Sequence, residues 1–166
     1  DPSQSGSDED PALSDPAVWA HLPSQVRGKV QRFGDMVDTD AIIPAQMMGC
    51  SPADMVKHGG RADMTEDEFL GSKCFAYVRP EFSGRVKEGM TVVVGGEGFG
   101  CGSSREEAVR SLKHAGVQAV IAKSFAFIYA RNQPNMSLLG VVVKDEDFYT
   151  RANEGSDVEV NVDSRT

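Results

Sequence analysis

The sequence lacks the paired cysteines of a disulfide framework or a metal-binding site. Its 166 residues contain three cysteines, Cys50, Cys74 and Cys101, an odd number that is scattered along the chain. None of them forms the Cys-x-x-Cys spacing that iron–sulfur and structural zinc sites commonly use. We therefore expect no metal centre held by this chain alone.

The sequence also lacks an excess of basic residues and any long apolar run. The formal net charge is −8, and no basic stripe that would favour nucleic acid is present. No apolar run approaches the ~20 residues of a membrane-spanning helix, and no secretory signal core is present. These absences predict a soluble cytoplasmic protein that binds neither nucleic acid nor membrane, or an organellar protein if Asp1 is a processed end.

The acidic charge is concentrated at the start of the chain. Residues 1–16 are rich in Asp, Ser and Pro and contain five carboxylates but no Lys or Arg. Removing these five charges from −8 leaves −3 for the remainder, which is an ordinary surface charge. Such a segment cannot bury enough apolar surface to fold. We predict a disordered acidic tail or linker over residues 1–16 and one domain over residues 17–166.

The most informative stretch is Val92–Arg105, which reads Val-Val-Val-Gly-Gly-Glu-Gly-Phe-Gly-Cys-Gly-Ser-Ser-Arg. The β-branched residues at Thr91–Val94 favour a buried strand. Five glycines in the next eight residues favour a loop that can approach a ligand closely. A helical pattern opens at Ser103 and runs to about His114, with Ser103 and Glu106 at the spacing of a capping box. Because a helix start attracts anions, the stretch predicts a carboxylate or phosphate site with two hydroxyls and one guanidinium.

The familiar glycine-loop motifs do not match this stretch. No three glycines have the spacing of the dinucleotide-binding fingerprint, and the last glycine is not followed by the lysine of a P-loop. The Gly-x-Ser-x-Gly pattern of a nucleophile elbow is absent as well. The residues alone therefore leave open a tight strand-to-helix turn that binds no ligand.

Further strands and helices are predicted on both sides of the loop. They are a strand at 28–34, a short helix at 52–58, the strand at 91–94, the helix at 103–114, a strand at 117–121, a helix at 123–132, a strand at 138–143 and an edge strand at 157–162. This order predicts an α/β fold in which parallel strands are joined by right-handed crossovers. Ligands then bind at the C-terminal ends of the strands, where the glycine loop lies.

Two other segments carry polar or adaptable side chains. Asp38, Thr39 and Asp40 follow the first strand, and this Asp-Thr-Asp sequence suits a helix cap better than a metal-binding loop. Residues 46–70 form a long excursion with one or two short helices. Long excursions in compact domains are often functional.

Three motifs, in this order, resemble one family. They are Phe33-Gly-Asp-Met-Val-Asp-Thr-Asp-Ala-Ile-Ile-Pro-Ala, Gly98-Phe-Gly-Cys-Gly-Ser-Ser-Arg-Glu and Val120-Ile-Ala-Lys-Ser-Phe-Ala. Together they resemble the small subunit of 3-isopropylmalate dehydratase, which is the swivelling domain of the aconitase superfamily. The resemblance covers about residues 28–143. It implies a swivelling β/β/α domain whose largely parallel core sheet is flanked by helices.

The resemblance also implies a partner and a cofactor. A large subunit or domain would hold a [4Fe–4S] cluster, and this chain would bind none itself. The swivelling domain would close over that partner, with a small hydroxy-dicarboxylate between the two. The family's reaction dehydrates the acid and rehydrates it, which moves a hydroxyl between adjacent carbons.

By motif position, the resemblance assigns roles to individual residues. Ser103 corresponds to the catalytic base that abstracts the proton α to a carboxylate. Asp40 corresponds to a second catalytic residue, an aspartate that hydrogen-bonds nearby groups. The substrate-binding residues that the motifs imply are Thr39, Gly102, Ser104 and Arg105.

The segment that carries specificity in the family departs here from its usual pattern. After Ile-Ile-Pro-Ala the family commonly has Tyr-Leu and a basic residue, whereas this chain has Met47 and Met48. A flexible apolar Met pair suits an alkyl substituent, and Arg61 is the loop cation that could bind a further carboxylate. We therefore expect a 2-alkylmalate such as isopropylmalate as substrate. The alternatives are a homoaconitase- or methylmalate-type dehydratase subunit and a non-catalytic carboxylate-binding domain.

Overall fold

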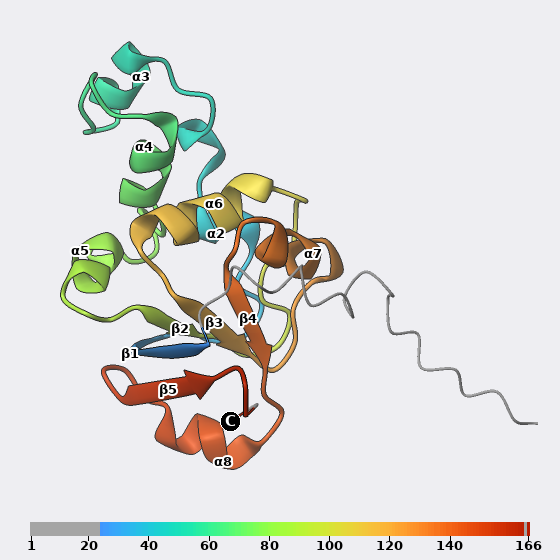
Figure 1. Ribbon diagram of the computed structural model, residues 1–166. Helices are drawn as coiled ribbons and strands as arrows, with labels where there is room; N and C mark the ends of the chain where they lie inside the picture. Colours follow the sequence, from blue (N-terminus) through green and yellow to red (C-terminus); the bar gives the residue numbers. More distant parts are fainter. Residues whose placement is uncertain (1–23, 165) are drawn as a thin grey trace, which may run out of the picture.

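The computed structural model describes residues 24–164 and 166, which form a five-stranded sheet with helices on both faces (Figure 1). The sheet has the order β4-β3-β2-β1-β5. Its strands are β1 (Gln25–Arg32), β2 (Val92–Val94), β3 (Ala119–Ala122), β4 (Leu139–Val142) and β5 (Asp157–Asn161). The first four strands pair in parallel, and β5 pairs antiparallel with β1 at the edge. The predicted acidic tail at residues 1–16 lies outside the described residues.

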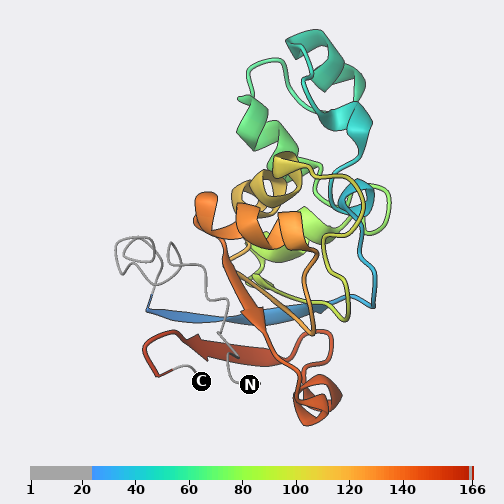
Figure 2. The same cartoon turned by 90° about the vertical axis from the view of Figure 1, so that its right-hand side faces the viewer.

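Most of the helices lie on one face of the sheet. The helices are α2 (Thr39–Ile42), α3 (Pro52–Lys57), α4 (Glu66–Ser72), α5 (Phe82–Lys87), α6 (Glu106–Ala115), α7 (Phe127–Asn135) and α8 (Glu146–Arg151), with a 3-10 turn at Ala45–Met47. Helices α5, α6 and α7 cover one face, and α8 covers the other, as the two views show (Figures 1 and 2). No helix among the described residues has the length and apolar character needed to cross a membrane.

The sheet separates two hydrophobic cores. Val93 and Val120 belong to the core beneath α5, α6 and α7. Their neighbours Val92, Val94 and Ile121 belong to the core on the α8 side. This alternation follows from the two-residue period of a strand, and β-branched residues suit a sheet that is buried on both faces. The predicted fold class, an α/β domain with a largely parallel sheet flanked by helices, is confirmed.

Helix α7 begins later than its sequence pattern indicates. The prediction started this helix at residue 123, whereas the structure starts it at Phe127. The preceding residues run alongside the glycine loop instead. The Phe99 N–H donates to the Ser124 carbonyl (3.1 Å), and the Ala126 N–H donates to the Phe99 carbonyl (2.9 Å). These bonds keep residues 124–126 extended and place the first turn of α7 beside the loop.

The long excursion predicted at residues 46–70 contains α3 and most of α4, which ends at Ser72, and it projects beyond the sheet layer (Figure 1). Both helices begin with a capping box, at Ser51 and at Thr65. Helix α4 packs along α6, where the Arg110 Nε donates to Asp67 Oδ1 at 3.1 Å. The short helix predicted at 52–58 corresponds to α3.

Candidate active site

The glycine loop bends through three residues with positive φ before it reaches α6. Gly98, Gly100 and Gly102 have φ values of 65°, 81° and 93°. Gly100 is also in close contact with Tyr129, because a Cβ added at Gly100 would lie 2.1 Å from the Tyr129 Cγ atom. Only glycine satisfies both conditions at this position. The glycine loop therefore packs tightly against the first turn of α7.

The Asp-Thr-Asp segment lies directly against this loop. The Gly100 N–H donates to the Val37 carbonyl (2.7 Å), and the Thr39 N–H donates to the Cys101 carbonyl (2.9 Å). The buried Thr39 hydroxyl then donates to the Ser103 carbonyl at 3.0 Å. Asp38 caps α2, since its Oδ1 accepts from the Ala41 N–H at 2.7 Å. Two motifs more than sixty residues apart in the sequence therefore form one structural unit.

Replacing Thr39 with valine is expected to lower the free energy of unfolding by about 0.5–1.5 kcal/mol, because the shape is kept and one hydrogen bond to the loop is lost. Urea denaturation measures this change, provided that the dependence of the unfolding free energy on urea concentration stays the same. The control is Thr150→Val, which removes an exposed hydroxyl bonded to the Asp147 carbonyl at 2.8 Å. If both substitutions have the same small effect, the Thr39 bond does not hold the loop.

The predicted capping box at Ser103 is wrong. Helix α6 begins at Glu106, its N-cap residue is Arg105, and no side chain caps it. Ser103 lies two residues before the cap, in a tight turn where the Arg105 N–H donates to the Ser103 carbonyl at 2.9 Å. Two donors, the Thr39 hydroxyl and the Arg105 N–H, hold the Ser103 carbonyl. The Ser103 residue itself is exposed.

Arg105 pairs with the aspartate that ends the Asp-Thr-Asp motif. Its Nη1 contacts Asp40 Oδ1 and lies 3.4 Å from the Ile43 carbonyl. The Arg105 side chain is 18% exposed, whereas that of Asp40 is 64% exposed. A guanidinium has five N–H donors, and within the described part of the chain only Nη1 of Arg105 is engaged. The pair therefore orients Arg105 and leaves donors for a second carboxylate.

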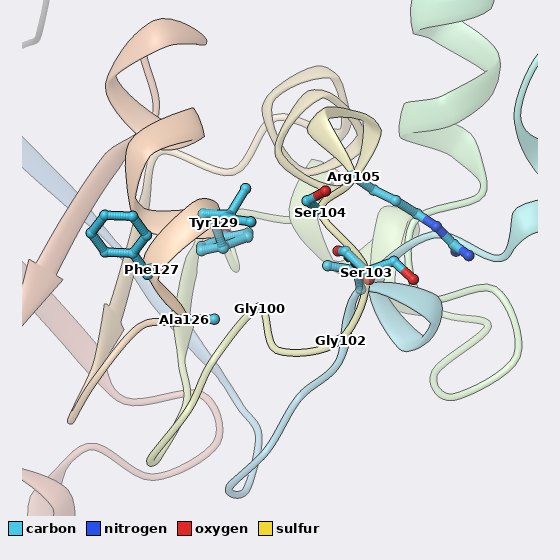
Figure 3. Close-up of a pocket in the computed structure, with 10 residues that line it drawn as sticks. Gly100, Gly102, Ser103, Ser104, Arg105, Ala126, Phe127 and Tyr129 are labelled. Carbon is cyan, nitrogen blue, oxygen red and sulfur yellow. Dashed lines mark hydrogen bonds between the residues drawn. The ribbon is translucent and has the colours of Figure 1, made fainter.

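A cavity of about 260 Å³ opens between the starts of α6 and α7 (Figure 3). Its volume is near the lower end of the range of small-molecule sites, which is about 300–1,000 Å³. Its lining residues are Thr39, Gly100, Gly102, Ser103, Ser104, Arg105, Ala126, Phe127, Ile128 and Tyr129. Figure 3 shows Ser103, Ser104 and Arg105 on one side and Ala126, Phe127 and Tyr129 on the other.

The structure brings together most of the site residues predicted from the sequence. Thr39, Gly102, Ser103, Ser104 and Arg105 line the cavity, and Asp40 joins them through its ion pair with Arg105. Their chemical roles stay predictions. Sequence reasoning missed the residues from Ala126 to Tyr129, although the Lys-Ser-Phe-Ala motif, which ends at Ala126, was a signal of their position.

Three other predicted site residues do not line this cavity. Met47 is buried in the main core with 4% exposure, and Met48 is partly buried against the same core. Arg61 lies in the exposed excursion, where its Nε contacts Asp63 Oδ1 at 3.0 Å. The Met pair was expected to present an apolar surface to substrate, but its packing turns Met47 inward instead. The cavity therefore does not support a substrate-binding role for Met47, Met48 or Arg61.

The donor set of this chain does not fit an iron–sulfur cluster. Residues 24–164 and 166 include no group of three or more His, Cys, Asp or Glu side chains placed to hold a metal ion. Cys74 is buried in the core, and its burial raises the pKa of the thiol to about 12. Cys50 and Cys101 lie in the excursion and in the glycine loop, so that the three thiols do not converge.

The fold and the loop geometry define a known class of domain. The chain belongs to the aconitase C-terminal domain family, whose model matches residues 22–146. The family resemblance inferred from the three motifs is thereby confirmed.

Individual relatives share this domain in proteins of different length. Aconitase htyD of Aspergillus rugulosus is 51% identical over 138 residues, which are 83% of this chain and 14% of that protein. The methanogen homoaconitase small subunit of Methanocaldococcus jannaschii is 41% identical over 83% of this chain and 70% of that protein. A crystal structure of 3-isopropylmalate dehydratase from the same organism has a TM-score of 0.68 and 39% identity, covering 84% of this chain and 72% of that one. The chain spans 14–18% of the length of the first long relatives that it matches.

Proposed function

We propose that this chain is the small subunit, or the swivelling domain, of an iron–sulfur hydro-lyase that isomerises a hydroxy-dicarboxylate of the 2-alkylmalate type. The observation that carries the proposal is the convergence of Ser103, Ser104 and Arg105 on one cavity beside Thr39 and Asp40. The names of relatives, which include homoaconitase and 3-isopropylmalate dehydratase, support this reaction class. A partner subunit or domain would hold the [4Fe–4S] cluster, because the cysteines of this chain do not converge.

In this proposal Ser103 acts as the base. Its oxygen takes the proton from the carbon α to a carboxylate, and the electron pair of that C–H bond forms the C=C bond as the hydroxyl leaves the adjacent carbon. In rehydration the hydroxyl adds to the carbon that lost the proton, and the proton adds to the carbon that lost the hydroxyl. The partner's cluster, when bound, would supply the Lewis acid that such a leaving hydroxyl needs.

The surroundings of Ser103 favour this chemistry. A serine hydroxyl is a weak acid and needs positive potential to act as a base after losing its proton. The uncapped start of α6 and the Arg105 guanidinium both lie beside it. Among the described residues, neither the Ser103 nor the Ser104 hydroxyl has a hydrogen-bond partner, which leaves both free for substrate.

Arg105 and Ser104 hold the substrate carboxylate in this proposal. The planar guanidinium can bind a carboxylate through two parallel N–H bonds, while Asp40 fixes its orientation from the other side. The exposed Ser104 hydroxyl adds a neutral donor. This chain would therefore bind and orient the acid and remove its proton.

Replacing Arg105 with lysine is expected to raise KM about tenfold or more, with a smaller change in kcat, because an ammonium cannot reproduce the bidentate contact. Steady-state kinetics of the complete enzyme on 2-isopropylmalate would measure both constants. Arg151→Lys, at an exposed position on α8, is the matched control. An unchanged KM in Arg105→Lys would remove Arg105 from the carboxylate site.

Purification of the native protein tests the proposal as a whole. We expect this sequence to be recovered with a larger iron–sulfur polypeptide, or joined to one, in a preparation that contains iron and sulfide. That preparation should convert 2-isopropylmalate with a rise in ultraviolet absorbance from the new C=C bond. If the native protein lacks iron and binds the acid without converting it, the domain is a carboxylate-binding module and the proposed function is wrong.

A further inference from the structure

The two walls of the cavity differ in chemistry. The wall formed by Thr39 and the segment from Gly102 to Arg105 offers hydroxyls. The Arg105 side chain extends from this wall away from Ala126 and Phe127, and its guanidinium contacts Asp40 (Figure 3). The opposite wall consists of Ala126, Phe127, Ile128 and Tyr129. The only polar side-chain atom on this wall is the Tyr129 hydroxyl, which is buried and has no partner among the described residues. Apart from this buried hydroxyl, the side chains opposite the carboxylate-binding groups are apolar.

The two aromatic residues of this apolar wall do not present their rings to the space beside Ser103. Tyr129 is 2% exposed, and its ring packs against Gly100 and stacks on Phe125 with the ring centroids 5.8 Å apart. Phe127 carries the Arg131 guanidinium 4.8 Å from its ring centroid. In Figure 3 the Phe127 ring lies on the side of α7 away from Ser103. The Tyr129 ring is therefore buried, and the Phe127 ring, although 72% exposed, faces away from a group bound beside Ser103.

Ile128 is the large aliphatic side chain among the residues that line the cavity, and it is 49% exposed. An aliphatic side chain at the edge of a polar site gains stability when an apolar group of a ligand covers it, at about 0.8 kcal/mol per buried CH₂. Ala126, which precedes α7, adds a methyl group on the same wall.

We infer that Ile128 is a specificity-determining residue that contacts the alkyl substituent of the substrate. The inference rests on the proposed function, and it moves substrate selection from the Met47–Met48 segment to the first turn of α7. A carboxylate held by Ser104 and Arg105 leaves the remainder of the acid facing the apolar wall. A larger alkyl group covers more of Ile128 than a methyl group does. The residue thereby favours branched 2-alkylmalates over smaller ones.

The test compares 2-isopropylmalate with 2-methylmalate in the complete native enzyme. The two acids share the reacting atoms and differ only in the alkyl substituent. For Ile128→Ala we expect kcat/KM on 2-isopropylmalate to fall about tenfold relative to kcat/KM on 2-methylmalate, since a few methylenes of contact are worth this much in a pocket. Ile128→Gln, which is one atom longer and places an amide on the wall, should lower the same ratio.

Control variants separate this effect from general damage. Val142→Ala shortens an exposed aliphatic side chain on β4 and should leave the ratio unchanged. If Ile128→Ala leaves the ratio unchanged, or if Met48→Ala changes it instead, the inference is overturned while the proposed function stands. If the unsubstituted enzyme converts neither acid, the proposed function fails, and this inference fails with it.

Discussion

Replacing Ser103 with alanine is expected to lower turnover of the complete enzyme by a factor on the order of 10² to 10⁴, which is the usual contribution of a general base. KM should change little, because Ser104 and Arg105 still bind the carboxylate. The measurement is the formation of the C=C bond, followed by ultraviolet absorbance. This is the largest effect on activity that we expect from a single substitution in this chain.

The neighbouring serine provides the control. Ser104→Ala removes an equal hydroxyl from the same cavity and should mainly raise KM. Neither variant should lose stability through a lost helix cap, since the N-cap residue of α6 is Arg105 and no side chain caps the helix. If Ser103→Ala retains near-normal turnover, Ser103 is not the base and the mechanism proposed above is wrong.

Replacing Gly100 with alanine should cause the largest loss of stability in the site. The new Cβ would lie 2.1 Å from Tyr129 Cγ, and the residue would keep a φ of 81°. Overpacking of a core costs about 1–3 kcal/mol, and a left-handed conformation costs about 1–2 kcal/mol for a non-glycine residue. The free energy of unfolding should therefore fall by about 2–5 kcal/mol, measured by urea denaturation.

Gly155 allows these two causes to be separated. Its φ is 80°, almost the same as that of Gly100, but a Cβ added there would meet no atom within 4 Å. Gly155→Ala should show only the conformational cost of about 1–2 kcal/mol. If Gly100→Ala is no worse than Gly155→Ala, the Tyr129 ring yields to the methyl group and does not hold the loop.

Much of the fold could be predicted from local patterns. The β-branched runs at β2 and β3 and the strand–helix alternation are short-range signals. The serine and arginine of the site were recognisable because they lie together in one motif. Strand periodicity and glycine chemistry act over a few residues, and the sequence displays them directly.

The remaining features depend on contacts between distant segments. The Arg105–Asp40 ion pair and the Thr39–Ser103 hydrogen bond join residues 65 and 64 positions apart. Met47 looks like an adaptable surface residue in sequence, and only the packing of the core shows that it is buried. The start of α6 was misjudged by three residues because a Ser-x-x-Glu spacing also occurs in a turn. Such contacts are set by the tertiary structure rather than by local preference.

The two cores on opposite faces of the sheet have a consequence for how this domain can change. The glycine loop, α6 and α7 contribute residues to one core. Helix α8, β5 and the strand residues that face α8 contribute to the other. Substitutions on separate sides share few partners, so their effects on stability should add independently. Stabilising changes selected on the α8 side, such as improved packing around Val160, can offset the destabilisation that new substrate preferences bring at the site. Because the sheet separates the two cores, the stability of the domain can be raised on the α8 side without disturbing the residues that bind the acid. Substitutions that change specificity at the site can then be tolerated.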